Sequence, residues 1–336
     1  MLEVRLGAEK GLDHLELRAA DEPAAPGPGE VAVQIAASSL NRHDFAVAIG
    51  RMGAAPGRLL LADAAGTVSA VGSGVDDLAV GDRVISCFFP DWEQGDNSVD
   101  SFARTPGDGI DGFAATHVVR PARWFTRAPA HMSLAEAATL PTAGLTAWRA
   151  LIACAALQPG QTLLILGTSS VSVIALQLAR AIGARTIVTS SSDAKLETMR
   201  ALGADMTVNY VTHPEWGAEV RRLTGGQGAD VTLEMGGAGT LDQSITATRI
   251  GGAIVLIGVM AGSAGHVPTS RLMFRQIRLM GIVVGSRAQQ RAMVADLERH
   301  RIAPVIAKTF PLAELGAAFR AMDAADYVGK IVITMD

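Results

Sequence analysis

The chain has 336 residues, of which 49% are hydrophobic, and a formal net charge of −4 at pH 7. Its length predicts two domains, and its scattered basic residues give no reason to expect nucleic acid or an anionic membrane as a partner. There are two cysteines, Cys87 and Cys154, which excludes a disulfide framework and an all-cysteine structural zinc site. Charged residues near the start and the shortness of every apolar run predict neither a signal peptide nor a membrane span, so we expect a cytoplasmic protein.

The first third of the chain has the pattern of strands joined by turns. In PGPGEVAVQIAASSLN (26–41), Pro and Gly precede alternating apolar residues, which is typical of a turn that leads into a strand. Residues 64–75 and 81–89 repeat this pattern. Residues 91–112 are polar and glycine-rich and predict a long surface loop, in which Trp92 either walls a substrate cleft or anchors the loop from inside.

The remaining part of the chain alternates between strands and helices. Residues 133–157 favour helix, and Ser133 with Glu136 forms a capping-box pattern at its start. Short apolar strands then alternate with helices up to about residue 285. This alternation predicts an α/β fold, with a parallel sheet covered by helices on both faces.

The segment TLLILGTSSVSVIALQLARAIGA (162–184) predicts a strand, a tight turn and a helix. In a dinucleotide-binding fingerprint, three glycines make the turn, admit the pyrophosphate and allow close packing of helix and strand. Here Gly167 is retained, while Ser169 and Ser172 stand at the other two positions. A helix N-terminus still offers N–H groups to a phosphate, so we predict cofactor contacts by Gly167, Thr168, Ser169, Ser170 and Val171. The alternative is a structural turn that has lost its ligand.

The end of the next predicted strand indicates which nicotinamide cofactor binds. A carboxylate at this place would bind the ribose 2′-hydroxyl of NAD, but the chain reads VTSSSDAKLE (188–197). Hydroxyls and a cation suit a 2′-phosphate, so we favour NADPH over NADH, although Asp193 argues the other way. The predicted contacts are Ser190, Ser191, Lys195 and Tyr210. Alternatively, Ser192 or Asp193 is only a helix cap, and Lys195 only faces solvent.

Glycines at the ends of later strands are further candidates for cofactor contact. Ligands of doubly wound sheets bind at the carboxyl ends of the strands, where this chain has Gly236, Gly258 and Gly285. Each of these glycines can also be needed only for a turn.

Several motifs, in order along nearly the whole chain, resemble the medium-chain dehydrogenase/reductase superfamily, and within it the zinc-free quinone-oxidoreductase-like branch. They are SSLNRHDF, ADAAGTVSAVGSGVDDLAVGDRV, DGFAATHVV, EAATLPTAGLTAWRAL, KLETMRALGAD and GKIVI. The resemblance implies a Rossmann doubly wound parallel sheet plus a GroES-like, mainly β catalytic domain. We expect the catalytic domain to comprise residues 1–126 and 287–336 and the Rossmann domain residues 127–286. We also expect a homodimer, paired through an edge strand at residues 277–284.

The zinc-binding members of this superfamily carry metal ligands at positions that can be compared one by one. Where they have the first catalytic cysteine, the histidine and the second cysteine, this chain has Asn41, Ala62 and Thr142. The lobe that holds their structural zinc corresponds to residues 91–112, which contain no cysteine. The resemblance therefore predicts an enzyme without zinc.

Without a Lewis acid, hydride transfer from NADPH to a quinone or an α,β-unsaturated carbonyl demands less of the protein than alcohol oxidation does. The resemblance places Asn41 at the nicotinamide, where it would contact either the substrate or the amide of the cofactor. It places Thr146 near the same amide; the alternative is that Thr146 serves only the packing of a helix. Asp44 is expected to hold its loop through backbone hydrogen bonds. His43 either relays a proton or is a partly exposed residue beside Arg42.

Three functions stay open on the sequence alone. The first is the zinc-independent NADPH-dependent reductase of quinones or unsaturated carbonyls. The second is a zinc-free NADP-dependent alcohol or aldehyde dehydrogenase. The third is a nucleotide-binding sensor with little catalysis, suggested by the serine-substituted turn.

Overall fold

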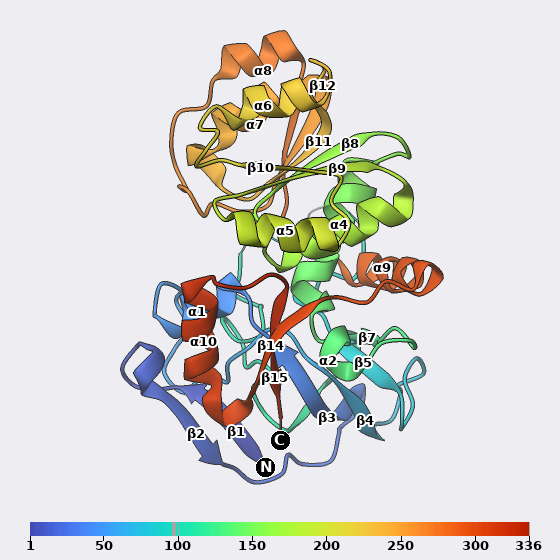
Figure 1. Ribbon diagram of the computed structural model, residues 1–336. Helices are drawn as coiled ribbons and strands as arrows, with labels where there is room; N and C mark the ends of the chain where they lie inside the picture. Colours follow the sequence, from blue (N-terminus) through green and yellow to red (C-terminus); the bar gives the residue numbers. More distant parts are fainter. Residues whose placement is uncertain (96–98, 100, 336) are drawn as a thin grey trace. The chain divides into compact units, whose positions relative to one another are not determined.

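The computed structural model describes residues 1–95, 99 and 101–335 (Figure 1). Its contacts divide the chain into two compact units. The first comprises Met1–Leu145, Val284–Asp326 and the strand that begins at Lys330, and the second comprises Thr146–Val283 with Tyr327–Gly329. The first break therefore falls after residue 145 and not at the expected residue 126, because residues 127–145 pack on the sheet of the first unit.

The first unit is built on a mainly antiparallel sheet with the strand order β14-β15-β3-β4-β5-β7, in which β6 also pairs with β3. The two C-terminal strands, β14 and β15, are parallel to each other, and β15 lies antiparallel to β3. This pairing brings the end of the chain beside an N-terminal strand. The strands are β3 (Glu30–Ser39), β4 (Ala65–Val71), β5 (Arg83–Ser86), β6 (His117–Pro121), β7 (Phe125–Arg127), β14 (Ile306–Pro311) and β15 (Lys330–Thr334).

Alternation of apolar residues places β3 in the core, as the sequence predicted. Val31, Val33 and Ile35 are buried, while Gln34 between them is exposed. Gly66 of β4 lies so close to β3 that a Cβ atom there would meet the carbonyl oxygen of Gln34 at 2.2 Å. A glycine is therefore required where these two strands cross closely.

Helices and a hairpin complete the first unit. The strands β1 (Leu2–Leu6) and β2 (Leu15–Ala19) form a separate antiparallel pair. The π-helical turn Leu140–Gly144 belongs to this unit, whereas a second π-helical turn, Arg149–Cys154, belongs to the second unit. The α-helices of this unit are α1 (Arg42–Ala48), α2 (Leu134–Ala137), α9 (Arg287–His300) and α10 (Leu315–Ala324), and within α3 (Leu145–Trp148) the chain passes from the first unit to the second.

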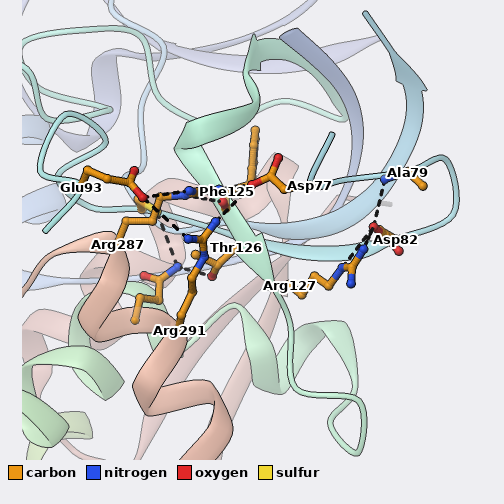
Figure 2. A network of polar contacts seen from close by, with 11 residues as sticks. Asp77, Ala79, Asp82, Glu93, Phe125, Thr126, Arg127, Arg287 and Arg291 are labelled. Carbon is orange, nitrogen blue, oxygen red and sulfur yellow. Dashed lines mark hydrogen bonds and ion pairs between the residues drawn. The ribbon is translucent and has the colours of Figure 1, made fainter. Parts of the chain in front are cut away.

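A network of charged side chains joins helix α9 to the strands and loops of the first unit, as Figure 2 shows. Arg287 is 5% exposed and donates to Asp77 Oδ2 at 2.6 Å, to Glu93 Oε1 at 3.1 Å and to the carbonyl of Phe125 at 3.1 Å. Gln290 lies one helical turn further and donates to Thr126 Oγ1 at 2.7 Å. Polar contacts, rather than apolar packing alone, therefore fix the start of α9.

The second unit contains a six-stranded parallel sheet with the order β10-β9-β8-β11-β12-β13. The strand order reverses between β8 and β11, which confirms the predicted doubly wound topology. All five residues of β8 are buried, as expected for a central parallel strand. The strands are β8 (Thr162–Leu166), β9 (Arg185–Ser190), β10 (Met206–Asn209), β11 (Ala229–Glu234), β12 (Thr248–Leu256) and β13 (Arg278–Gly281).

Helices α4 and α5 pack on β8, β9 and β10, whereas α7 packs on β11 and β12. The helices of this unit are α4 (Ser170–Ile182), α5 (Asp193–Ala201), α6 (Trp216–Leu223), α7 (Leu241–Ala247) and α8 (Thr269–Arg275). In the described part of the sheet, β13 pairs with β12 alone, so it is the edge strand that the sequence predicted. Within the described residues, no helix has both the length and the apolar character needed to cross a bilayer.

The segment 91–112 differs from the surface loop that its composition predicted. Trp92 is 2% exposed and Asp108 is 5% exposed, and Thr105 is fully buried. Gly112 donates its N–H to the carbonyl of Leu59 at 2.8 Å, which ties the end of the segment to the unit's interior. The abundant glycines thus serve close backbone packing and not only exposed turns. Of the two alternatives for Trp92, its burial favours the anchor.

Candidate functional site

Asp63, which precedes strand β4, is the centre of a buried polar cluster in the first unit. Its side chain is fully buried. One carboxylate oxygen, Oδ2, accepts hydrogen bonds from Ser39 Oγ at 2.8 Å and Asn41 Nδ2 at 2.9 Å, and the other accepts from Thr142 Oγ1 at 2.6 Å. A buried carboxylate of this kind is stable because hydrogen bonds replace the water it has lost.

Lys330, the first residue of β15, supplies the positive charge of this cluster. It is 2% exposed, and its Nζ donates to the carbonyl of Leu40 at 2.8 Å and to Asn41 Oδ1. The same Nζ lies 3.7 Å from Asp63 Oδ2. Burial lowers the pKa of Lys330, and the neighbouring Asp63 and Asp44 act in the opposite direction. We call Asn41, Asp63, Thr142 and Lys330 the buried cluster.

Asp44 holds two segments of backbone together beside the buried cluster. Its carboxylate accepts the N–H of Asn41 at 2.9 Å and the N–H of Ala62 at 3.0 Å. With Asn41 it forms a capping box at the start of α1. These are backbone bonds of the kind expected for a residue that holds its loop. Burial and the nearby Asp63 raise the pKa of Asp44 to about 7.

The buried cluster stands where zinc-binding relatives were expected to carry their catalytic metal ligands. At these positions the chain has the amide of Asn41, the methyl group of Ala62 and the hydroxyl of Thr142. The amide and the hydroxyl both donate hydrogen bonds to Asp63. Catalytic zinc needs three protein ligands with free lone pairs, usually from His, Cys or a carboxylate. Within the described chain, no group of three His, Cys, Asp or Glu residues is arranged to hold a metal ion. The residues present do not fit a catalytic zinc site.

His43, in the first turn of α1, has a carboxylate neighbour that the sequence did not reveal. Its side chain is 12% exposed, and Nε2 lies 3.3 Å from Asp108 Oδ2. The imidazole also contacts the rings of Phe88 and Phe102. Burial lowers the pKa of His43, against the effect of Asp108 and Asp63. Asp108 was missed because it belongs to the segment that composition assigned to a surface loop.

The serine-substituted turn of the second unit keeps the geometry of a dinucleotide-binding turn. Gly167 has φ +75°, a conformation that favours glycine. Helix α4 begins after Ser169, and no side-chain hydrogen bond from that N-cap residue occupies its first N–H groups. Ser172 instead donates to the carbonyl of Leu166 at 3.2 Å, and the Ser169 hydroxyl lies 3.6 Å from Met235 Sδ. The N–H groups of the helix start therefore stay available for a phosphate.

The residues predicted to read the ribose lie at the ends of β9 and β10. Ser190 ends β9, and its backbone carbonyl accepts the N–H of Tyr210 at 3.0 Å. Ser192 is the N-cap of α5 and accepts the N–H of Lys195 at 3.4 Å, as one alternative had it. Asp193 accepts a hydrogen bond from Asn209 Nδ2 at 2.8 Å, so its carboxylate has a partner within the protein.

Among the remaining candidates, Gly236 is held by a residue that sequence reasoning missed. The buried Glu234 accepts the N–H groups of Gly236 at 2.7 Å and Gly237 at 3.0 Å, and also the hydroxyls of Thr240 and Ser244. The other predicted contacts lie in different parts of the chain. Thr146 belongs to the second unit and is 7% exposed, Gly258 lies just after β12, and Gly285 belongs to the first unit. Glu234 was missed because a single acidic residue at the end of a strand does not by itself indicate that it holds the backbone of the following glycines.

Comparisons with known proteins agree with this architecture. Residues 27–130 match the alcohol dehydrogenase GroES-like domain, and residues 170–299 match the zinc-binding dehydrogenase domain. A zinc-type alcohol dehydrogenase-like protein of Schizosaccharomyces pombe is 36% identical over 339 residues, covering 97% of this chain and 96% of the relative. The chain belongs to the medium-chain dehydrogenase/reductase superfamily.

Two solved structures of this superfamily extend the comparison. An alcohol dehydrogenase homologue of Sinorhizobium meliloti 1021 has a TM-score of 0.92 and 36% identity, with 99% of each chain covered. A structure described as an NAD-dependent alcohol dehydrogenase has a TM-score of 0.90 and 34% identity, with 100% of each chain covered. The predicted superfamily, the fold and the class of enzyme, a nicotinamide-dependent oxidoreductase, are thereby confirmed.

Proposed function

We propose that this oxidoreductase works without zinc and transfers hydride from NADPH to an α,β-unsaturated carbonyl or a quinone. The observation that carries the proposal is the buried cluster, in which an Asp63 carboxylate and a Lys330 ammonium organise Asn41 and Thr142. In this arrangement Asn41 keeps one amide hydrogen as a hydrogen-bond donor where a zinc enzyme offers a metal ion, since the single hydrogen of the Thr142 hydroxyl is donated to Asp63. Donors of this kind stabilise an enolate or hydroquinone oxygen, whose charge develops only as hydride arrives.

The second unit would hold the cofactor. Gly167, Thr168 and the N-terminus of α4 would bind the pyrophosphate, and Ser190, Ser191 and Lys195 the 2′-phosphate. The hydrogen bond between Asp193 and Asn209 favours NADPH, because that carboxylate already has a partner. Bound NADPH supplies the hydride. His43 is the proposed proton relay. Its Nε2 lies 3.3 Å from Asp108 Oδ2 without a hydrogen bond among the described residues, and burial lowers the pKa of the imidazole, which favours its neutral form at neutral pH.

A zinc-free NADP-dependent alcohol or aldehyde dehydrogenase is the second candidate. One relative is named a zinc-type alcohol dehydrogenase-like protein and one similar structure an NAD-dependent alcohol dehydrogenase, and these two names favour it. The oxygen of an alcohol substrate becomes negatively charged only after its proton has been removed, and only then does it need a hydrogen-bond donor. The buried cluster therefore supports the reductase better. Turnover of an alcohol with NADP⁺ in the presence of a chelator would favour the dehydrogenase. Tight NADPH binding without turnover of any substrate would favour the nucleotide-binding sensor.

We also propose that the protein is a homodimer in the cytoplasm and acts on a small carbonyl or quinone compound, with no nucleic-acid or membrane partner. The edge strand β13 supports the dimer because, in the described part of the sheet, it pairs with β12 alone. In helix α8, which precedes β13 along the chain, Met273 and Phe274 are 66% and 77% exposed. A sheet edge without a strand partner favours pairing with a second copy.

The first experiment is a titration of the purified protein with NADPH and with NADH, followed by tryptophan fluorescence and nicotinamide emission. We predict tighter binding of NADPH. Lys195→Ala should weaken NADPH binding about tenfold through loss of one charge-assisted contact, and leave NADH binding unchanged. Lys308→Ala, which removes an exposed lysine of the first unit, is the matched control. Equal binding of both cofactors by wild type and Lys195→Ala would contradict this prediction.

A screen of quinones and cyclic enones then tests the reaction, with NADPH oxidation followed at 340 nm after exhaustive dialysis against a chelator. We expect turnover that survives chelation and zinc contents far below one ion per chain. Loss of activity on chelation, restored by zinc, would overturn the zinc-independent function.

A further inference from the structure

We propose that Lys330 and Asp63 lock the amide of Asn41 in one orientation, so that Asn41 Nδ2 donates to the carbonyl oxygen of the substrate. Lys330 is then a positioning residue, and Asn41 is the residue that touches the substrate. The inference rests on the proposed reduction of unsaturated carbonyls or quinones, and it names the group that stabilises the reacting oxygen.

The orientation of the Asn41 amide follows from the chemistry of its two neighbours. An asparagine amide has an accepting end and a donating end of nearly the same shape, so many asparagines can be turned over without loss of fit. At Asn41 this freedom is absent, because Lys330 can only donate and the Asp63 carboxylate can only accept. Turning the amide over would place its NH₂ against an ammonium and its oxygen against a carboxylate.

The Nδ2 atom keeps one hydrogen for another acceptor. It carries two hydrogens, and one is donated to Asp63 Oδ2 at 2.9 Å. Among the described residues, no second protein acceptor is found for Asn41 Nδ2. Asn41 is 8% exposed, whereas Lys330 is 2% exposed and Asp63 is fully buried. Asn41 is therefore the most accessible of these three residues.

The charge of Lys330 strengthens this donor. An ammonium hydrogen bonded to Oδ1 draws electron density from the amide, which makes the remaining N–H a better donor. Lys330 itself cannot meet a substrate directly, because its Nζ is directed to Leu40, Asn41 and Asp63. Its charge reaches the substrate only through Asn41.

A purely structural anchor is the competing explanation for Lys330. The anchor would join β15 to the loop after β3, which the hydrogen bond to Leu40 already does. Buried ion pairs contribute little net stability compared with apolar residues of similar size, so stability alone does not require a lysine here. The two explanations differ in what they predict for a bound carbonyl compound.

The test uses the full-length protein with NADPH and 2-cyclohexenone as probe, and compares four variants. Asn41→Leu and Asn41→Asp remove the donor, Lys330→Met removes the charge, and Lys330→Arg retains it. Lys308→Met, on the neighbouring strand β14, is the control and should keep wild-type kcat. Circular dichroism and thermal unfolding confirm that each variant is folded.

We expect both Asn41 variants to lower kcat about a hundredfold, the effect of losing one donor to a developing oxyanion. Lys330→Met should lower kcat about tenfold and leave the Kd for NADPH unchanged, and Lys330→Arg should recover most of this loss. The infrared C=O stretch of cyclohexenone bound with NADP⁺ should lie at lower frequency in wild type than in Lys330→Met or Asn41→Leu. A structural anchor would not change that frequency in a folded variant.

Two results would overturn the inference: folded Lys330→Met with wild-type kcat and C=O frequency, or Asn41→Asp with wild-type kcat. If Lys330→Met does not fold, the Asn41 variants decide, because wild-type kcat in Asn41→Asp or a wild-type C=O frequency in Asn41→Leu would overturn the inference. The proposed function fails separately, if wild type reduces no enone or quinone. In that case, an unshifted C=O stretch of bound cyclohexenone in wild type would remove the inference as well.

Discussion

At the scale of single residues, two carboxylates, Asp44 and Asp63, lie buried close to one lysine. The pKa of Asp44 is raised from 3.8 to about 7. Between these two pH values, the folded protein therefore keeps a proton on Asp44 that the unfolded chain has released. This contribution to the free energy of unfolding is present at low pH and is lost as the pH rises through 7. A residue that does not titrate at this position removes this pH dependence of the free energy of unfolding.

We therefore predict that Asp44→Asn destabilises the protein less at pH 8 than at pH 5. The difference between the two pH values should be about 2 kcal/mol, the linkage expected for a raised pKa over this interval. Urea unfolding of wild type and variant at both pH values measures it. Asp326→Asn, at an exposed position, should show the same effect at both pH values. A constant effect of Asp44→Asn across pH would contradict the prediction.

Met235 and Glu234 show how residues outside a motif support it. Met235 Sδ contacts the hydroxyls of Ser169 and Ser172 in the turn after β8, and Glu234 accepts the backbone N–H groups of Gly236 and Gly237. Ser169, which stands where the fingerprint has a glycine, therefore contacts Met235 directly after β11. The Ser169 side chain does not cap the first N–H groups of α4.

At the scale of elements, the start of α9 depends on one buried guanidinium (Figure 2). Arg287 donates to two carboxylates and one backbone carbonyl, and its side chain is 6% exposed. Asp77 and Glu93 are about half exposed, so water screens them and can solvate them if the arginine is removed. The remaining cost comes from the Phe125 carbonyl and from lost packing.

Arg287→Met should lower the free energy of unfolding by about 2 kcal/mol, because hydrogen bonds of a charged donor are lost while the stem of the side chain is preserved. Arg299→Met in the same helix should change it by less than about 0.5 kcal/mol, since the Arg299 side chain is 67% exposed and water screens its ion pair with Asp296. Chemical denaturation of the three proteins checks this. Equal effects of the two substitutions would show that the network adds nothing beyond a surface ion pair.

At the scale of the whole molecule, the exposed edge of the second unit's sheet is the feature most relevant to assembly. Leu279 packs with the cluster of Leu241, Ile245 and Ile254, so Met280, the next residue of β13, faces the other way. A charge on an edge strand opposes pairing with another strand.

Met280→Lys should therefore convert the proposed dimer to a monomer at micromolar concentration. Val80→Lys, which changes a side chain that is 66% exposed in the first unit, should leave the dimer intact. Size-exclusion chromatography with light scattering distinguishes the two masses. A monomeric wild type, or a dimeric Met280→Lys, would count against pairing through β13.

Features that repeat locally along the chain were predictable from its sequence. Alternating apolar residues marked β3, and short apolar runs between helices marked the parallel sheet. Gly167 marked the tight turn between β8 and α4, because that turn requires a φ that other residues avoid. These signals arise from backbone geometry and burial within a few residues, and so a single sequence carries them.

The composition of the candidate site depends on tertiary structure. Lys330 and Asn41 are 289 positions apart and meet only because β15 pairs with β3. Asp108 reaches His43 from a segment whose polar composition predicted exposure. The sequence by itself determined the superfamily, the doubly wound sheet and the departures from the zinc ligands. Only the folded chain decided which charges share the buried cluster, because contacts between distant residues leave no local pattern.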